Sequence, residues 1–300
     1  MITGTARLNR IARAPATLAF VLFATPALAQ EADAAAGEGP ATPWSLSLSG
    51  GASIPDSGKG DTYQSASITR GIGAGYVSLS GMRSVAQGTG RLASPGSTAQ
   101  RLTLGGGIAF GQVSLDAYGT IGRRTFKPFR LPLRRISISG TGHEWSVGGS
   151  ITWTLLASGH LSLSPYVSGD TGTVETARVI NGFAGPLSVR EKQKGTSGSA
   201  GVNLSRSFGP DGVHAFGANL AYATSSNASA SSASGFGPRG MRRLRPLGQG
   251  SSGGDSWLEY GVSGAFQLGQ AVGIDVSADR TAGVLGPEST SVSAGLRYSF

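Results

Sequence analysis

The sequence predicts an all-β chain whose antiparallel strands close into a barrel and cross a membrane. Three observations support this prediction. Segments of about ten residues alternate apolar and polar side chains, which is typical of strands with one face in lipid. The connections between these segments alternate between short and long. The composition includes 49 glycines and only 14% charged residues, so it disfavours long amphipathic helices.

The N-terminal residues do not share this pattern. Three arginines precede an apolar run, and residues 27–29 have the small-x-small form of a signal-peptidase site. We therefore predict a cleaved signal peptide over residues 1–30. Residues 31–43 are rich in Ala, Gly and Pro and are expected to form a flexible periplasmic leader. The barrel is expected to span residues 44–300.

The chain has no cysteine, which excludes a disulfide framework and thiolate metal sites. We expect no cofactor and no bound metal. After the signal peptide, no stretch approaches the length of a transmembrane helix, so a membrane location requires a closed barrel.

Twelve alternating segments follow one another from residue 44. The apolar positions of the first six are Trp44, Leu46 and Leu48 (44–50), Ala66 and Ile68 (63–70), Val77 and Leu79 (75–81), Leu102, Leu104, Ile108 and Phe110 (101–110), Val113, Leu115 and Ile121 (113–122), and Trp145, Val147, Ile151 and Trp153 (144–156). Those of the last six are Leu161, Leu163 and Val167 (161–169), Val202, Leu204 and Phe208 (197–208), Phe216, Leu220 and Tyr222 (213–223), Leu258, Tyr260 and Val262 (257–268), Val272, Ile274 and Val276 (271–280), and Val292, Leu296, Tyr298 and Phe300 (291–300). Pro165 weakens the seventh segment, because proline cannot donate to a ladder. The second segment is weak and loop residues near Ile136 or Val189 could extend the ladders, so ten or fourteen strands are the alternatives.

The connections provide an independent test of the barrel. The short ones, expected to be periplasmic turns, lie near Gly71 and at residues 111–112, 157–159, 209–212 and 269–270. The long ones, expected to be extracellular loops, are residues 52–61, 83–99, 122–142, 170–195, 224–255 and 281–289. A soluble β-sandwich has no reason for such an asymmetry, so the barrel is favoured.

The final ten residues, SVSAGLRYSF, resemble the C-terminal signal of Gram-negative outer-membrane β-barrel proteins. The resemblance implies that Leu296, Tyr298 and Phe300 form the face recognised by the barrel-assembly machinery. It also implies a location in the cell outer membrane. The Gly/Ser-rich pattern is similar to autotransporter translocator barrels and to small porin-like channels. Unlike autotransporters, the sequence has no long passenger before Trp44.

The inward faces of the predicted strands carry mainly serine and glycine, which predicts either a water-filled lumen or one occupied by a loop or by the leader. The predicted lumen charges are few: Asp116, Glu259, Asp275, Asp279 and Arg297. Glu259 and Asp279 are expected near the external mouth on neighbouring strands. Two close carboxylates could bind a cation, although hydrated lumen charges are the simpler interpretation.

Basic residues gather in two predicted extracellular loops. They are Arg123, Arg124, Lys127, Arg130, Arg134 and Arg135 in the first, and Arg239, Arg242, Arg243 and Arg245 in the second. Arginine suits bidentate phosphate contacts, so lipopolysaccharide of the surrounding leaflet is the preferred partner. The alternative is an electropositive vestibule that attracts anionic solutes. We expect no nucleic-acid partner.

Histidines provide weak support for catalysis. The spacing of His160 and Ser162 resembles that of lipid A deacylase barrels, and His143 with Glu144 and Ser146 lies near the predicted external rim. No context for an oxyanion hole accompanies either group, so we predict that the chain is not an enzyme.

The function that the sequence favours is a porin-like channel for small hydrophilic solutes, including anionic ones. One alternative is a passengerless autotransporter-like or secretion-accessory barrel whose lumen is occupied. Another is a scaffold whose basic loops bind lipopolysaccharide or polysaccharide.

Overall fold

The computed structural model describes residues 44–56, 60–87, 96–131, 136–158, 160–182, 185–226, 254–283 and 288–300. The elements are β1 (Trp44–Pro55), β2 (Asp61–Ile72), β3 (Gly75–Ala86), β4 (Ser97–Phe110), β5 (Val113–Leu131), β6 (Ile136–Trp153), β7 (Leu155–Ser158), β8 (Leu161–Gly182), β9 (Gly185–Phe208), the 3-10 turn η2 (Pro210–Gly212), β10 (His214–Ser225), β11 (Asp255–Gln267), β12 (Val272–Ala282) and β13 (Ser289–Ser299). Within these ranges no helix is long and apolar enough to cross a membrane.

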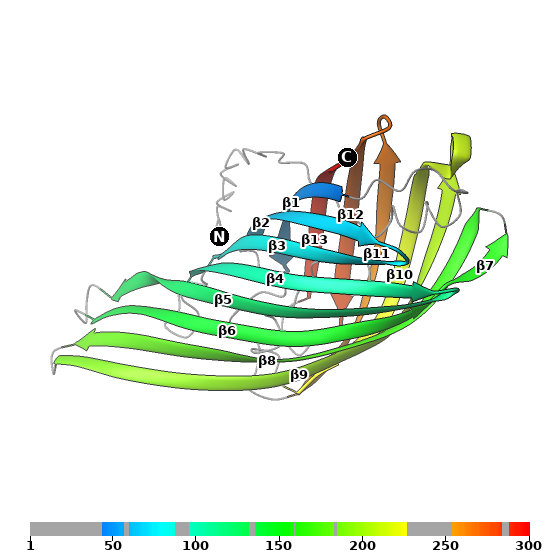
Figure 1. Ribbon diagram of the computed structural model, residues 1–300. Helices are drawn as coiled ribbons and strands as arrows, with labels where there is room; N and C mark the ends of the chain where they lie inside the picture. The colour runs from blue at the N-terminus through cyan, green and yellow to red at the C-terminus, as the bar shows by residue number, and fades with distance from the viewer. Residues whose placement is uncertain are drawn as a thin grey trace, which may run out of the picture.

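All strands belong to one antiparallel sheet that closes on itself (Figure 1). Consecutive strands pair with each other except β6 and β7, and β1 pairs with β13. The short β7 continues β6 beyond Thr154, and both pair with β8. The ring therefore has twelve strands, which confirms the predicted fold class.

The two ends of the barrel chain meet at the closing seam. Ser45 pairs with Ser299, and the register continues to Pro55 and Ser289. The backbone N–H of Phe300 donates to the carbonyl of Trp44 over 3.0 Å, and the Trp44 N–H donates back over 3.2 Å. These bonds leave no free edge between β1 and β13 within the described residues.

Alternate side chains give the sheet two different faces. The outward positions carry exposed apolar residues on every long strand, such as Val147 and Ile151 on β6. From Trp145 to Trp153 the apolar stripe of β6 covers about 27 Å of strand, or about 20 Å of height at the tilt usual for such barrels. An exposed apolar belt of this height is suited to the hydrocarbon core of a membrane.

The connections at one end of the barrel, here the turn end, are short. Two of them are two-residue turns, in which Gly73 and Gly111 have φ values of 57° and 59°. Such positive φ values favour glycine and match the twist of a hairpin. The opposite end, the loop end, carries the connections after β1, β3, β5, β8, β10 and β12.

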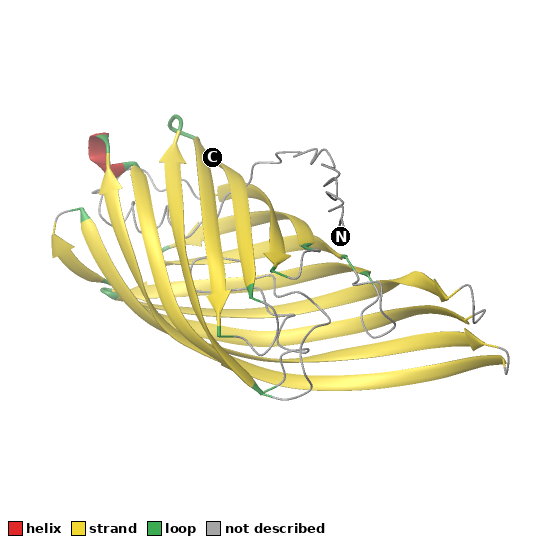
Figure 2. Cartoon of the chain, turned by 180° about the vertical axis from the view of Figure 1, so that it is seen from behind, coloured by secondary structure: helices red, strands yellow, loops and turns green. Residues whose placement is uncertain are grey.

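Two of the predicted long loops are wrong. Most of residues 122–142 belongs to β5 and β6, and most of residues 170–195 belongs to β8 and β9. Figures 1 and 2 show these four strands extending past the ends of the others on one side of the barrel. Their outward face beyond the apolar belt is mainly polar, with residues such as Arg123, His143 and Lys192, so strand pairing continues after the apolar alternation has ended.

Candidate functional site

The inner wall of the barrel is lined by hydroxyl groups that pair across neighbouring strands. Their oxygen–oxygen distances are 2.6 Å for Ser47 and Ser67, 2.7 Å for Ser277 and Ser293, 2.7 Å for Ser168 and Ser199, 2.5 Å for Ser162 and Ser205, and 2.9 Å for Thr103 and Thr120. Ser291 also donates to Ser53 over 3.0 Å. Successive side chains of a strand point to opposite faces, so serines that alternate with lipid-facing residues point into the lumen. The lumen wall is therefore hydrophilic around most of its circumference.

The structure places all five predicted lumen charges on the inward face. Asp275 and Arg297 lie near the turn end, where the Arg297 guanidinium donates to the Gln267 side-chain carbonyl over 3.1 Å. Glu259 and Asp279 lie on β11 and β12, with Glu259 opposite Thr281 in the register. Among the described residues, no group of three acidic, His or Cys side chains could hold a metal ion.

The fifth predicted charge, Asp116, belongs to a small polar network near the turn end. The Tyr76 hydroxyl donates to Asp116 Oδ1 over 2.7 Å, and the Ser150 hydroxyl donates to Oδ2 over 3.2 Å. Gly107 lies beneath this network, and a Cβ there would collide with the Asp116 carboxylate. The glycine therefore allows the longer side chains to lie flat against the wall.

A buried ionic cluster in the lumen was missed by the sequence analysis. The Glu144 carboxylate accepts from Arg101 Nε and, over 2.7 Å, from Arg124 Nη2. The side chains of Arg101 and Glu144 are only 2% and 1% exposed. Gly122 makes room for them, because a Cβ there would lie 2.8 Å from Glu144 Cγ.

The alternation itself could have identified Arg101, since it shares the inward face with Thr103. Arg124 could not be identified in this way. The preceding outward position is the charged Arg123, so the apolar alternation that marks the strand ends before Arg124. A second buried carboxylate, Asp61 on β2, also interacts electrostatically with Arg124. Arg101 Nη2 and Arg124 Nε are buried without a hydrogen-bond partner.

The strand order determines which charged residues face each other across the lumen. In the twelve-membered ring β4 lies opposite β11, and β5 lies opposite β12. Arg101 and Arg124 therefore stand on the wall opposite Glu259 and Asp279. Each half of the lumen carries both signs of charge, because Asp116 and Glu144 lie on the same wall as the two arginines and Arg297 lies on β13, beside β12.

The predicted basic loops are only partly in described residues. Arg123, Arg124, Lys127 and Arg130 lie on β5 rather than in a loop, because β5 continues to Leu131. Arg123 and Lys127 are exposed on the outward face, whereas Arg124 is buried on the inward face. The remaining basic positions, Arg134, Arg135, Arg239, Arg242, Arg243 and Arg245, lie outside the described residues.

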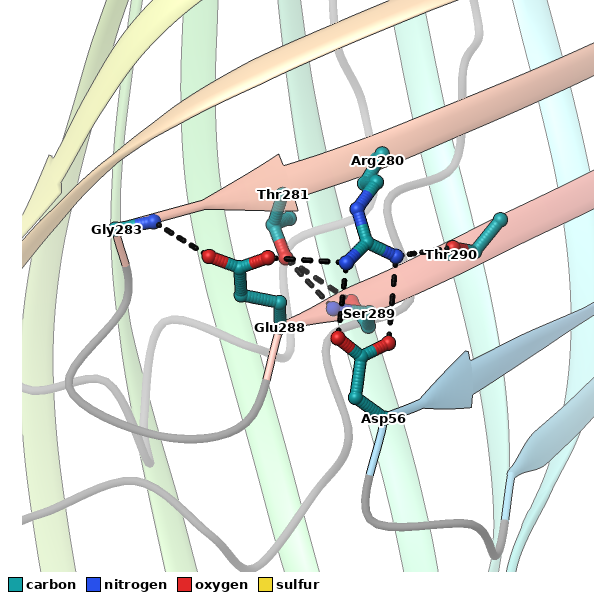
Figure 3. Close-up of polar contacts among 7 residues, drawn as sticks. All are labelled: Asp56, Arg280, Thr281, Gly283, Glu288, Ser289 and Thr290. Atoms are coloured by element: carbon teal, nitrogen blue, oxygen red, sulfur yellow. Dashed lines mark hydrogen bonds and ion pairs between the residues drawn. The ribbon is translucent and has the colours of Figure 1, made fainter.

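Arg280 faces outward at the loop end, on the other side of the sheet from Glu259 and Asp279 (Figure 3). Its guanidinium donates to Asp56 over 2.8 and 3.3 Å, to Glu288 over 3.0 Å and to Thr290 over 2.9 Å. The two acids neutralise the arginine and join the loop ends of β1, β12 and β13.

The histidine groups considered for catalysis are not assembled. His143 is exposed on the outward face of β6, whereas Glu144 and Ser146 are buried on the inward face. The sheet therefore separates His143 from both potential partners. Ser162 pairs with Ser205 inside the lumen, and His160 is exposed at the turn end.

Two solved structures of bacterial proteins have a similar architecture. The translocator domain of the autotransporter NalP from Neisseria meningitidis superposes with a TM-score of 0.63 at 13% identity, over 92% of this chain and 98% of that chain. The fold is that of an outer-membrane β-barrel. The β domain of the Bordetella autotransporter BrkA gives a TM-score of 0.53 at 18% identity, over 86% of this chain and 98% of that chain. No protein-family model and no curated protein matches the sequence. The outer-membrane β-barrel fold thus rests on architecture, and the function must be argued from the lumen.

Proposed function

We propose that this outer-membrane β-barrel is a channel through which small hydrophilic solutes pass across the outer membrane. The observation that carries the proposal is the hydroxyl-lined wall, in which serine and threonine pairs occupy much of the inward face beside a smaller number of large side chains such as Tyr166. A solute that loses part of its hydration shell could exchange water for these hydroxyls.

The predicted preference for anionic solutes depended on the basic loops. Arg123 and Lys127 face outward on a strand, so they do not line the lumen. The proposal is therefore restricted to hydrophilic solutes, without a preferred sign of charge.

Conductance in a planar lipid bilayer tests this proposal. We expect the purified, refolded chain to give stable single-channel steps in potassium chloride. A barrel that inserts, as shown by protease protection, but carries no current would contradict the channel. Boiled protein provides the matched control for conductance by detergent or contaminants.

A second candidate is a translocator-like barrel with an occupied lumen. It is supported by the two translocator structures, which this chain matches over nearly their whole length. This candidate predicts that the full mature chain is silent and that deletion of residues 31–43 opens it. Recognition of Leu296, Tyr298 and Phe300 by the barrel-assembly machinery remains a prediction, although all three lie on the outward face of β13 or just after it.

A further inference from the structure

The strands sort charged side chains by sign between the two faces of the sheet. On the outward face, the basic residues of the described strands are Arg70, Arg83, Arg123, Lys127, Arg190, Lys192, Lys194, Arg206 and Arg280. The one acid among the described outward strand residues is Glu175, which forms an ion pair with Lys192. The positive charge of the described strands therefore lies mainly on the outside of the barrel.

The inward face has the opposite balance. Its described carboxylates are Asp61, Asp116, Glu144, Asp170, Glu191, Asp255, Glu259, Asp275 and Asp279, and its described basic residues are Arg101, Arg124, Arg178 and Arg297. Carboxylates thus outnumber guanidinium groups on the described wall of the lumen.

Most of the inward arginines already have acidic partners or lie away from the remaining carboxylates. Glu144 accepts from both Arg101 and Arg124, and Asp61 also interacts with Arg124. Arg178 lies further toward the loop end, on the extension of β8. These three arginines therefore do not offset the carboxylates nearer the turn end.

The acidic groups are also the more accessible ones. Asp116, Asp170 and Asp279 are half-buried, whereas every inward arginine except Arg178 is buried. A solute inside the lumen would therefore meet carboxylates at the surface of the wall.

Asp116 and Asp170 lie close to two tyrosines on neighbouring strands. Asp116 accepts hydrogen bonds from neutral hydroxyls, one of them on Tyr76, so its negative charge remains on the wall. Tyr118 extends over Gly148 toward Asp170, because a Cβ at Gly148 would lie 2.6 Å from the Tyr118 hydroxyl oxygen and 2.7 Å from Asp170 Cβ. Carboxylates and aromatic rings thus share one part of the wall, from β3 to β8.

Both kinds of group favour positive charge. A carboxylate attracts a cation directly, and the face of an aromatic ring attracts a cation through its quadrupole. A lumen with walls of low dielectric constant concentrates such a field and raises the local concentration of counter-ions.

We propose that the lumen passes hydrophilic cations in preference to anions, and that Asp116 and Asp170 determine this preference. The inference rests on the proposed channel and adds the sign of the solute's charge. It is opposite to the anionic preference expected from the basic residues, because those on the described strands mostly face outward.

The reversal potential across a planar bilayer with a potassium chloride gradient tests this preference. We expect potassium to permeate roughly threefold or more better than chloride in the wild type. D116N/D170N should lower this permeability ratio by roughly half or more, because two accessible carboxylates lose their charge. The matched control is E175Q, which removes a carboxylate from the outward face of the strand that carries Asp170. E175Q should keep the wild-type ratio.

The outcomes separate this inference from the channel itself. A conducting wild type with a permeability ratio of one or less would overturn the cation preference and leave the channel standing. An unchanged ratio in D116N/D170N, or equal losses in this variant and in E175Q, would also overturn the inference. A barrel that inserts without carrying current would contradict the channel and the cation preference together. Retained resistance to unfolding in cold SDS would show that both variants are folded.

Discussion

Replacing Glu144 with glutamine is expected to lower the free energy of unfolding by about 3–5 kcal/mol. The Glu144 carboxylate is the shared acceptor of two buried guanidinium groups. Without its charge, Arg101 and Arg124 would face each other in the barrel interior with no anion between them. Urea-induced unfolding in phospholipid vesicles, followed by tryptophan fluorescence, measures this loss.

The control for this prediction removes the whole cluster. The triple variant R101Q/R124Q/E144Q removes both arginines together with their shared acceptor, so it should recover part of the stability that E144Q loses. If E144Q alone unfolds like the wild type, the ionic cluster does not contribute to the stability of the barrel.

The second large effect is expected on the lipid face. Val276 is an exposed outward residue in the middle of β12. Replacing it with arginine should destabilise the barrel by about 2–4 kcal/mol, because a charge near the bilayer midplane loses its hydration. The same urea titration measures the effect.

The neighbouring residue provides the matched control. Ser277 faces the lumen, where its hydroxyl pairs with Ser293 over 2.7 Å. Arginine at this position remains in polar surroundings, so S277R should cost clearly less than V276R. Equal losses for the two variants would contradict the assigned inward and outward faces of β12.

The sequence predicted the fold well because lipid and lumen impose opposite demands on alternate residues. On β6 the alternation of Trp145 and Val147 with Ser146 and Gly148 identifies the strand and both of its faces. The closing strand was equally clear, since apolar residues alternate up to Phe300. Strand number and pairing order follow from these patterns and from the short turns.

The extensions of β5, β6, β8 and β9 could not be predicted because they leave the apolar belt. Beyond Ile121 the outward residues become polar, so the backbone pairing has no signature in hydrophobicity. For the same reason, the sequence did not reveal that Arg124 points inward and forms an ion pair with Glu144. Long-range pairs such as Arg280 with Asp56 depend on the closure of the barrel, which joins residues from opposite ends of the chain.

The most direct test of a solute pathway uses the absence of cysteine from the chain. Ser67 lies on the inward face of β2, and the adjacent Ala66 faces outward. A charged, membrane-impermeant thiol reagent should reduce the single-channel conductance of S67C in steps and leave that of A66C unchanged. Unaltered conductance in a fully modified S67C barrel would contradict passage along the hydroxyl-lined lumen.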